Sequence, residues 1–247
     1  MAAYEHDTIV PFKESTEGKK KQLEEMFDKI AFRYDFLNHF LSAGIDVGWR
    51  KKAIRQLESI KPKKVLDVAT GTGDVAILTY KILKPETIVG IDISEGMLNI
   101  GKKKIQTLGL QKHIELLKGD SETINFEDNS FDAVTVAFGV RNFENLEKGL
   151  GEIKRVLRPG GKVVILECTK PTLPIIKNLY NFYSNIIIPL VGRLISRNKN
   201  AYQYLNDSVQ KFPEREVFTN ILKKTGYKNP TCKTLSLGIS CIYCGEK

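Results

Sequence analysis

Residues 67–74 read DVATGTGD, a stretch that combines an aspartate with two closely spaced glycines. Gly71 and Gly73 allow the backbone to turn tightly and to approach a ligand without a Cβ in the way. The apolar run before the stretch predicts a strand, and the residues after it suit a helix whose first N–H groups have no backbone acceptor. A strand, a glycine loop and a helix in this order are typical of a site that binds a small cofactor.

Two classes of cofactor fit such a loop. The spacing Gly71-x-Gly73-x-x-Ala76 matches the dinucleotide fingerprint, and Asp92 lies about 20 residues further on, where that fold places a ribose-binding acid. A nicotinamide-dependent oxidoreductase is therefore one hypothesis. Asp67 favours the other, S-adenosylmethionine, because a carboxylate beside the loop attracts a cationic sulfonium ligand with an ammonium group and repels a pyrophosphate.

Acidic and polar residues also follow the next two predicted strands. Asp92 follows the second strand, where it can accept hydrogen bonds from both hydroxyls of a ribose; the alternative is an acid that caps the next helix. Asp120 and Ser121 follow the third strand, where an adenine would lie. Open α/β sheets bind ligands at the carboxyl ends of their strands. The predicted cofactor-binding residues are therefore Asp67, Gly71, Thr72, Gly73, Asp92, Asp120 and Ser121.

The elements that must position these residues alternate from Lys63 onward. Short apolar runs predict strands at 64–69, 87–93, 113–117, 131–138 and 162–168, and the residues between suit helices over 74–83, 94–108 and 144–157. This alternation predicts an α/β fold with a mostly parallel sheet covered on both faces. A helix near 213–225 follows, and then two strand-like runs at 231–235 and 238–244. Because these runs are close in the chain, we expect an antiparallel pair at the sheet edge.

Two segments fall outside this alternation. Residues 170–212 hold three prolines and an aromatic and aliphatic stretch, which predicts an insertion that covers the site. Over residues 19–60, apolar residues recur at spacings of three and four and predict a helix with one apolar face: Leu23, Met26, Phe27, Ile30, Tyr34, Leu37 and Leu41. The expected parts are an N-terminal arm and helical cap (1–60), a cofactor-binding core (61–169), a substrate lid (170–212) and a C-terminal completion of the sheet (213–247).

Several short motifs accompany the glycine loop. They are Ala31-x-x-Tyr34-Asp35-x-x-Asn38, Leu41-Ser42-x-Gly44, Trp49-Arg50, Leu66-Asp67-x-Ala69-x-Gly71-Thr72-Gly73-Asp74, Phe138-Gly139-Val140-Arg141-Asn142 and Arg155-Val156-Leu157-Arg158-Pro159-Gly160-Gly161. Together they resemble the quinone-biosynthesis C-methyltransferases, a family that includes the demethylmenaquinone methyltransferases and their ubiquinone-pathway relatives. The Phe-Gly-x-Arg-Asn motif and the Tyr-Asp-x-x-Asn helix are the most specific of these motifs. The resemblance covers nearly the whole chain.

The resemblance implies a class I methyltransferase fold, which is Rossmann-like, with S-adenosylmethionine as cofactor. The implied reaction is methylation of demethylmenaquinol, a polyprenyl naphthoquinol, to menaquinol. Methylation of a polyprenyl benzoquinol in ubiquinone biosynthesis is the alternative. The family's cofactor contacts fall on Thr72, Asp92 and the pair Asp120-Ser121. Where some members have a serine before the Phe-Gly motif, this chain has Ala137.

Arg141, Asn142 and Tyr34 are the predicted catalytic residues. In the implied reaction a ring carbon becomes nucleophilic when the neighbouring phenol ionises, and a phenol near pKa 10 is ionised in only about one molecule per thousand at pH 7. Arg141 is expected to stabilise that oxyanion, Asn142 to position the same oxygen, and Tyr34 to reach in from the N-terminal helix. The alternatives are a structural arginine paired with an acid and a tyrosine that only packs. No histidine falls in a motif, so no general base is predicted.

Composition limits the other function classes. The net charge of +9 comes from 38 Lys and Arg against 29 Asp and Glu. The basic residues are spread along the chain without the aromatic and basic stripe of an RNA-binding motif, so nucleic acid is not an expected partner. Cys241 and Cys244 form only half of a zinc site and suit a strand, so no metal is predicted.

The chain has no apolar run of the roughly 18 residues that suggest a membrane span. It also lacks an N-terminal apolar signal, so a cytoplasmic location is expected. A prenylated quinol lies in the bilayer, and we therefore expect transient contact with the inner face of the cytoplasmic membrane. The segment 175–195 is aromatic and aliphatic with nearby arginines, and it is the predicted contact. The alternative for this segment is packing on the core, and a homodimer is left open.

Overall fold

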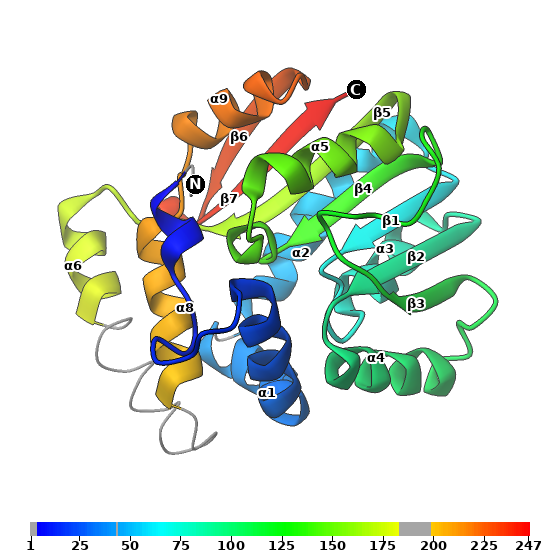
Figure 1. The fold of residues 1–247 in the computed structure, drawn as a ribbon. Helices are drawn as coiled ribbons and strands as arrows, with labels where there is room; N and C mark the ends of the chain where they lie inside the picture. Colours follow the sequence, from blue (N-terminus) through cyan, green and yellow to red (C-terminus); the bar gives the residue numbers. More distant parts are fainter. Residues whose placement is uncertain (1–3, 43, 183–198) are drawn as a thin grey trace.

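The computed structural model describes residues 4–42, 44–182 and 199–247 (Figure 1). A seven-stranded sheet lies at its centre, with the strand order β3-β2-β1-β4-β5-β7-β6. Strands β1 to β5 are parallel, whereas β7 is antiparallel to both β5 and β6. The predicted mostly parallel sheet with an antiparallel final strand is confirmed. The strand bounds are β1 Lys64–Val68, β2 Thr87–Asp92, β3 Ile114–Lys118, β4 Phe131–Ala137, β5 Leu157–Cys168, β6 Lys228–Leu235 and β7 Ser240–Glu246.

Helices cover both faces of this sheet. The helices α5 (Leu146–Val156) and α9 (Glu216–Lys224) pack on one face, and their buried residues join one apolar cluster with the strands. The helices α2 (Ile45–Ile54), α3 (Asp74–Leu83) and α4 (Glu95–Thr107) contribute to a second cluster on the other face. Because apolar side chains are buried on both faces, the central strands read as continuous runs of valine, isoleucine and leucine.

Local signals set the ends of α4, which lies within the predicted helix 94–108. The Ser94 side chain accepts a hydrogen bond from the backbone N–H of Met97 at 3.1 Å, which satisfies a donor that the first turn leaves open. At the other end Gly109 adopts a φ of 68°, a left-handed conformation in which glycine carries no steric cost.

The boundary between α5 and β5 differs from the prediction. We expected Pro159-Gly160-Gly161 to separate the helix from a strand that starts at Lys162, but β5 starts at Leu157. Leu157 pairs with Phe131, and the register then shifts so that Lys162 pairs with Ala133. The Arg-Pro-Gly-Gly motif is therefore an irregularity inside the strand. A Cβ on Gly161 would lie 2.8 Å from the carbonyl oxygen of Arg158, which explains the glycine there.

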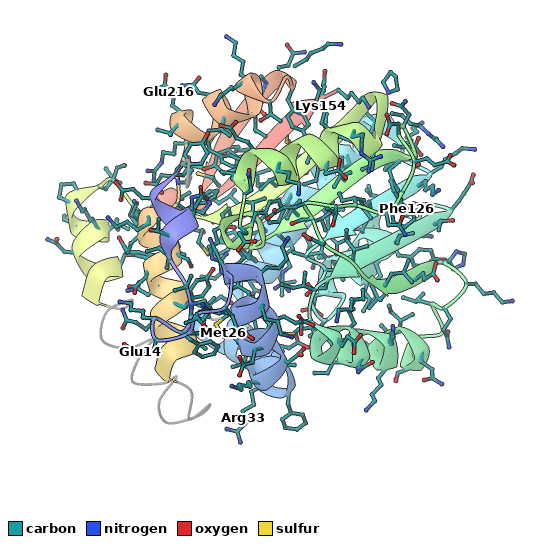
Figure 2. The ribbon with its side chains drawn as sticks, viewed as in Figure 1. Glu14, Met26, Arg33, Phe126, Lys154 and Glu216 are labelled. Carbon is teal, nitrogen blue, oxygen red and sulfur yellow. The ribbon has the colours of Figure 1, made fainter. Side chains whose placement is uncertain are left out.

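The N-terminal part packs beside the sheet as a short 3₁₀ turn, η1 (Glu5–Thr8), and a long helix, α1 (Lys19–Leu41). Figure 2 shows Met26 on the inner side of α1, whereas Arg33 is exposed and points outward. The predicted apolar face is present as far as Tyr34, and the side chains of Leu37 and Leu41 lie outside the described residues. The face joins a third apolar cluster with α4 and with a later helix, α8 (Lys199–Lys211): Leu23, Met26, Ile30, Ala31, Met97, Ala201 and Tyr204.

The described part of residues 170–212 includes the helices α6 (Pro174–Phe182) and α8 (Lys199–Lys211). Helix α6 lies at the outer edge of the molecule (Figure 1). Residues 183–198, which include much of the predicted lid and most of the predicted membrane contact, lie outside the described residues. Within the described ranges, no helix has the length and apolar character that a membrane span requires.

Candidate active site

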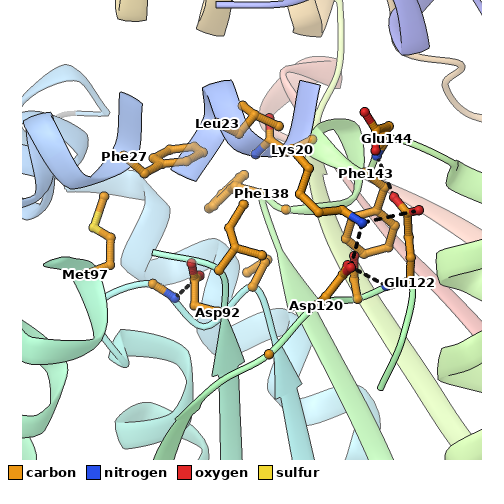
Figure 3. A pocket seen from close by; sticks show the side chains of 18 of the residues that line it. Lys20, Leu23, Phe27, Asp92, Met97, Asp120, Glu122, Phe138, Phe143 and Glu144 are labelled. Atoms are coloured by element: carbon orange, nitrogen blue, oxygen red, sulfur yellow. Dashed lines mark hydrogen bonds and ion pairs between the residues drawn. The ribbon is translucent and has the colours of Figure 1, made fainter. Parts of the chain in front are cut away.

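A pocket lies at the carboxyl ends of the central strands, with α1 over it (Figure 3). Three loops contribute predicted cofactor residues to its lining: Gly71 follows β1, Asp92 ends β2, and Asp120 and Ser121 follow β3. We call these four residues the cofactor half of the site. The predicted catalytic residues Tyr34 and Asn142 line the same pocket. Asp67, Thr72, Gly73 and Arg141 lie beside the pocket rather than in its lining.

Asp92 links two of the loops. Its Oδ2 accepts a hydrogen bond from the Gly71 N–H at 2.8 Å, and its Oδ1 accepts one from the Ser94 N–H at 2.9 Å. Burial raises the pKa of Asp92, although these N–H donors oppose the rise. The residue therefore fixes the start of α4, the role weighed as its alternative, and still presents its carboxylate to the pocket.

Asp67 lies beneath the glycine loop. It is 1% exposed, and its two oxygens accept hydrogen bonds from the hydroxyls of Thr70 and Thr135, each at 2.6 Å. Burial raises the pKa of Asp67 to about 6. Its contacts thus brace the loop against β4 instead of pointing into the pocket.

Thr72 and Gly73 shape the loop on its other side. The Thr72 hydroxyl donates to Asp35 of α1 at 2.5 Å and accepts from Lys104 of α4 at 3.0 Å. Gly73 has a φ of 78° and precedes α3. Gly71 is also left-handed, and no atom lies within 4 Å of the place where its Cβ would be. That open space beside Asp92 is what a bound cofactor needs for close approach to the backbone.

Lys20 reaches from α1 into the pocket, a contact that the sequence did not single out. Its Nζ lies 2.6 Å from Asp120 Oδ2 and 3.7 Å from Glu122 Oε2 (Figure 3). Burial alone would raise the pKa of Asp120, but the hydrogen bonds from Lys20 and from the Glu122 N–H hold it below its usual value. The only sequence signal for this contact was a small basic cluster at the start of the predicted helix.

Helix α1 is fastened to the loops at further points along its length. Asp28 accepts hydrogen bonds from the Ser94 hydroxyl at 2.6 Å and from the Gly96 N–H at 2.9 Å. Asp35 forms an ion pair with Lys104. Together with Lys20, these contacts tie α1 to the loops that follow β1, β2 and β3, so that the helix closes one side of the pocket.

The other end of the site holds an ion pair between Arg141 and Glu167. Arg141 belongs to a short 3₁₀ turn, η3 (Val140–Asn142), after β4, and it is 6% exposed. Its Nη1 pairs with Oε1 of Glu167, a fully buried residue near the end of β5, and donates to the Phe138 carbonyl at 2.8 Å. Burial opposes the charge on Arg141, but the carboxylate of Glu167 outweighs it and raises the pKa of Arg141.

This pair is the structural alternative that the sequence left open for Arg141. Two buried atoms of the pair, Arg141 Nε and Glu167 Oε2, nevertheless have no hydrogen-bond partner among the described residues. Each could therefore bind one more polar atom. Glu167 was missed at the sequence level, where its only signal was an acid near the end of the fifth strand.

The side chain of Asn142 is held by a hydrogen bond from a residue outside the Phe-Gly-x-Arg-Asn motif. The hydroxyl of Tyr204, on α8, donates to Asn142 Oδ1 at 2.9 Å. Tyr34, which lines the pocket, packs edge-on against Phe27 with ring centroids 6.0 Å apart. We call Arg141, Asn142, Glu167 and Tyr204 the acceptor half of the site.

The cysteines show no arrangement for a metal. Cys241 packs in the cluster on one face of the sheet and Cys244 against the cluster on the other, as expected for residues three apart in a strand. No group of three or more potential ligands occurs in the ranges that the structure describes.

Comparison with known proteins assigns this chain to a class, the S-adenosylmethionine-dependent methyltransferases. The ubiE/COQ5 methyltransferase family matches the chain over residues 15–247, and the chain belongs to this family. It is 46% identical over 245 residues to the demethylmenaquinone methyltransferase of Bacteroides fragilis, covering 99% of each chain. It is 44% identical over 237 residues to the ubiquinone/menaquinone biosynthesis C-methyltransferase of Geotalea daltonii, covering 96% of this chain and 100% of that one.

Solved structures agree at the level of the fold. A possible histamine N-methyltransferase from Thermotoga maritima superimposes with a TM-score of 0.64 at 18% identity, covering 91% of this chain and 99% of that one. A putative methyltransferase from Methanococcus maripaludis gives a TM-score of 0.62 at 22% identity, covering 96% and 97%. The predicted class I methyltransferase is confirmed and the nicotinamide-dependent alternative is not supported.

Proposed function

We propose that this protein transfers a methyl group from S-adenosylmethionine to a ring carbon of demethylmenaquinol, a 2-polyprenyl naphthoquinol, and so produces menaquinol. The observation that carries the proposal is the pocket, in which the cofactor half and Asn142 come together from four strand ends. The relative from Bacteroides fragilis bears the name of this activity. A polyprenyl benzoquinol is the second candidate substrate, because the name of the Geotalea daltonii relative includes both quinones.

In this proposal the cofactor half binds the methyl donor. Asp92 accepts hydrogen bonds from the ribose hydroxyls, while Asp120 and Ser121 bind the adenine and the open backbone at Gly71 lets the ligand approach. Asp67, Thr72 and Gly73 act indirectly, since their contacts hold the loop and α1 in place. The negative charge of this half suits a cationic donor.

The acceptor half prepares the ring carbon. The cofactor supplies an already activated methyl group, so the protein's task is to align it with the carbon and to exclude water. Transfer would form the new C–C bond as the S–C bond breaks, would release the demethylated cofactor, and would pass the proton of the ring carbon to water. Arg141 Nε and the amide of Asn142 would stabilise the neighbouring phenolate oxygen. Glu167, which is buried behind the pocket, would act by holding Arg141, the phenolic proton would pass to water, and Tyr34 would pack over the methyl donor.

The substrate's polyprenyl tail implies contact with a membrane surface. Ile175, in the first turn of α6, is 82% exposed, and Leu173, just before the helix, is 53% exposed. We propose that this end of the predicted 175–195 segment touches the inner face of the cytoplasmic membrane, with Lys177 beside it for anionic headgroups. The homodimer stays a prediction, which sedimentation of the purified protein would test.

Two measurements test the function. Only a ligand of the native state raises the melting temperature, so S-adenosylmethionine should stabilise the protein while NAD and NADP at the same concentration do not. Transfer of a labelled methyl group to reduced demethylmenaquinone, compared with the reduced demethyl benzoquinone, then identifies the acceptor. No transfer to either quinol, despite cofactor binding, would contradict the proposal.

A further inference from the structure

Tyr204 lies directly behind a residue of the pocket. It is on α8, it is 2% exposed, and its hydroxyl donates to Asn142 Oδ1 at 2.9 Å. The two residues are 62 positions apart in the chain. Asn142 lines the pocket and is half-buried, whereas Tyr204 is absent from the lining. The hydrogen bond therefore acts on the reactive space through Asn142.

This contact distinguishes the two ends of the Asn142 amide. A side-chain amide has an acceptor oxygen at one end and two N–H donors at the other. Tyr204 occupies the oxygen, and no atom of the described residues accepts a hydrogen bond from Nδ2. Since Asn142 is only half-buried, its N–H donors are left for a ligand of the pocket.

The surroundings of Tyr204 fix the direction of its hydrogen bond. Burial raises the pKa of Tyr204, so the phenol stays protonated and must place its proton on an acceptor. The positive guanidinium of Arg141 acts on the same oxygen, and a guanidinium can only donate. The phenol proton is thus turned away from Arg141 and toward Asn142 Oδ1.

We infer that Tyr204 is a positioning residue that holds Asn142 with its N–H groups toward the methyl acceptor, so that the site favours an ionised acceptor oxygen. This inference rests on the proposed function and extends it. With the amide reversed, Asn142 would present its carbonyl oxygen to a phenolate and repel it. Helix α8, from the region predicted as a lid, in this way takes part in selecting the charge state of the substrate.

Tyr204→Phe tests the inference, because it removes the hydroxyl and keeps the ring. Turnover of the reduced naphthoquinone should fall about 10-fold at pH 7, less than the loss of a whole oxyanion donor. The pH at which turnover rises should be higher in the variant than in wild type, because the bound phenol is harder to ionise. The affinity for S-adenosylmethionine should stay within about 2-fold of wild type, since the cofactor half is untouched.

Tyr227→Phe is the matched control. Tyr227 is 3% exposed and donates from its hydroxyl to the Leu150 carbonyl at 2.9 Å, outside the pocket. Both variants lose one buried hydrogen bond, so both should melt at a lower temperature. Only Tyr204→Phe should change turnover and the pH profile. In an Asn142→Ala background, Tyr204→Phe should have little further effect, because the residue through which it acts is gone.

A second readout does not depend on turnover. Bound 1-naphthol, titrated by absorbance, reports directly how far the pocket lowers the pKa of a phenol. The naphthol pKa should be lower in wild type than in Tyr204→Phe, with Tyr227→Phe matching wild type. If the wild type methylates no quinol but this difference is found, the proposed function fails and the positioning role stands. Equal naphthol pKa values in all three proteins would overturn the role, whatever the turnover.

Discussion

The two halves of the site are held together over different ranges of the sequence. In the cofactor half, Asp92 accepts from the N–H of Ser94, two positions away, and Asp120 from the N–H of Glu122, also two positions away. In the acceptor half, the two main contacts join residues 26 and 62 positions apart. The acids of the first half are therefore held in part by their own strand ends, although Asp92 also accepts from Gly71, 21 positions away, and Asp120 from Lys20, 100 positions away. The second half has its main contacts only when η3, β5 and α8 are assembled.

The halves also differ in whether their charged groups face the pocket or are buried. The carboxylates of the cofactor half line the pocket, where a cationic ligand can reach them. The charges of the acceptor half are buried against one another, with one exposed fraction of 6% and one of 0%. Removing one partner of such a pair leaves an uncompensated buried charge. Substitutions in the acceptor half should therefore affect both stability and catalysis, and those in the cofactor half mainly ligand binding.

Arg141→Met should have the largest effect. Glu167 would be left buried without its partner and, because burial raises the pKa of its carboxyl, would either bear an uncompensated charge or take up a proton. The free energy of unfolding should therefore drop by about 3–5 kcal/mol. The double variant Arg141→Met with Glu167→Gln removes both charges and keeps an acceptor for the Cys168 N–H, which Glu167 now binds at 2.9 Å. Denaturant titration should show most of the lost stability restored in the double variant.

A measurement of turnover separates the structural role of the Arg141–Glu167 pair from the catalytic role proposed for it. If Arg141 stabilises the phenolate, the double variant should fold and bind cofactor but turn over about 10²-fold more slowly than wild type. A stable double variant with wild-type turnover would show that the pair is structural only, and the contrast between the two halves would be lost.

The next largest effect is expected at Asp67, whose ionisation makes the stability of the folded protein depend on pH. The unfolded carboxyl has a pKa near 3.9, whereas burial raises that of the folded protein to about 6. Between these values the native state binds more protons than the unfolded state, so its stability falls as pH rises from about 4 to about 6. Each unit of the shift corresponds to about 1.4 kcal/mol.

Asp67→Asn should remove this dependence. The free energy of unfolding of the variant should increase relative to that of wild type as the pH rises over the same range. Every other titrating group is shared by the two proteins, so the difference isolates Asp67. A constant difference from pH 4 to pH 7 would show that Asp67 stays ionised and faces the ligand more directly than its contacts indicate.

Asp92→Ala should weaken the binding of S-adenosylmethionine by about 1–3 kcal/mol, because the ribose hydroxyls lose their acceptor. The control is Asp132→Ala. Asp132 accepts from the N–H groups of Lys63 and Lys64 at 2.9 and 2.8 Å and lies outside the pocket. Both changes release two backbone donors, but calorimetry should find the affinity loss only in Asp92→Ala. Equal affinities in the two variants would remove Asp92 from the cofactor half.

These halves also mark what the sequence could predict. A helix start such as that at Ser94 and an acid at a strand end such as Asp92 depend on neighbours in the chain, so pattern and spacing located them. The partners Glu167 and Tyr204 were missed because nothing local marks a contact across 26 or 62 positions. The early start of β5 was missed for a related reason. Only the pairing with Phe131 on another strand shows that Leu157 is a strand residue.

The smallest expected effect is at Lys20, where α1 meets the cofactor half. Its Nζ lies 2.6 Å from Oδ2 of Asp120, a residue proposed to bind the adenine, and the side chains of Lys20 and Asp120 are 35% and 24% exposed. Pairs of this exposure contribute about 0.2–1 kcal/mol, so Lys20→Met should tighten S-adenosylmethionine binding by about 1.5- to 5-fold by removing a competitor and a positive charge. Added salt should bring the affinity of wild type toward that of the variant.

The variant Lys118→Met is the control and should leave the affinity unchanged. Lys118 pairs with Glu24 of α1 at 2.8 Å and lies outside the pocket. Weaker binding in Lys20→Met would instead mean that Lys20 contacts the ligand's own carboxylate, and the cofactor half would then extend onto α1.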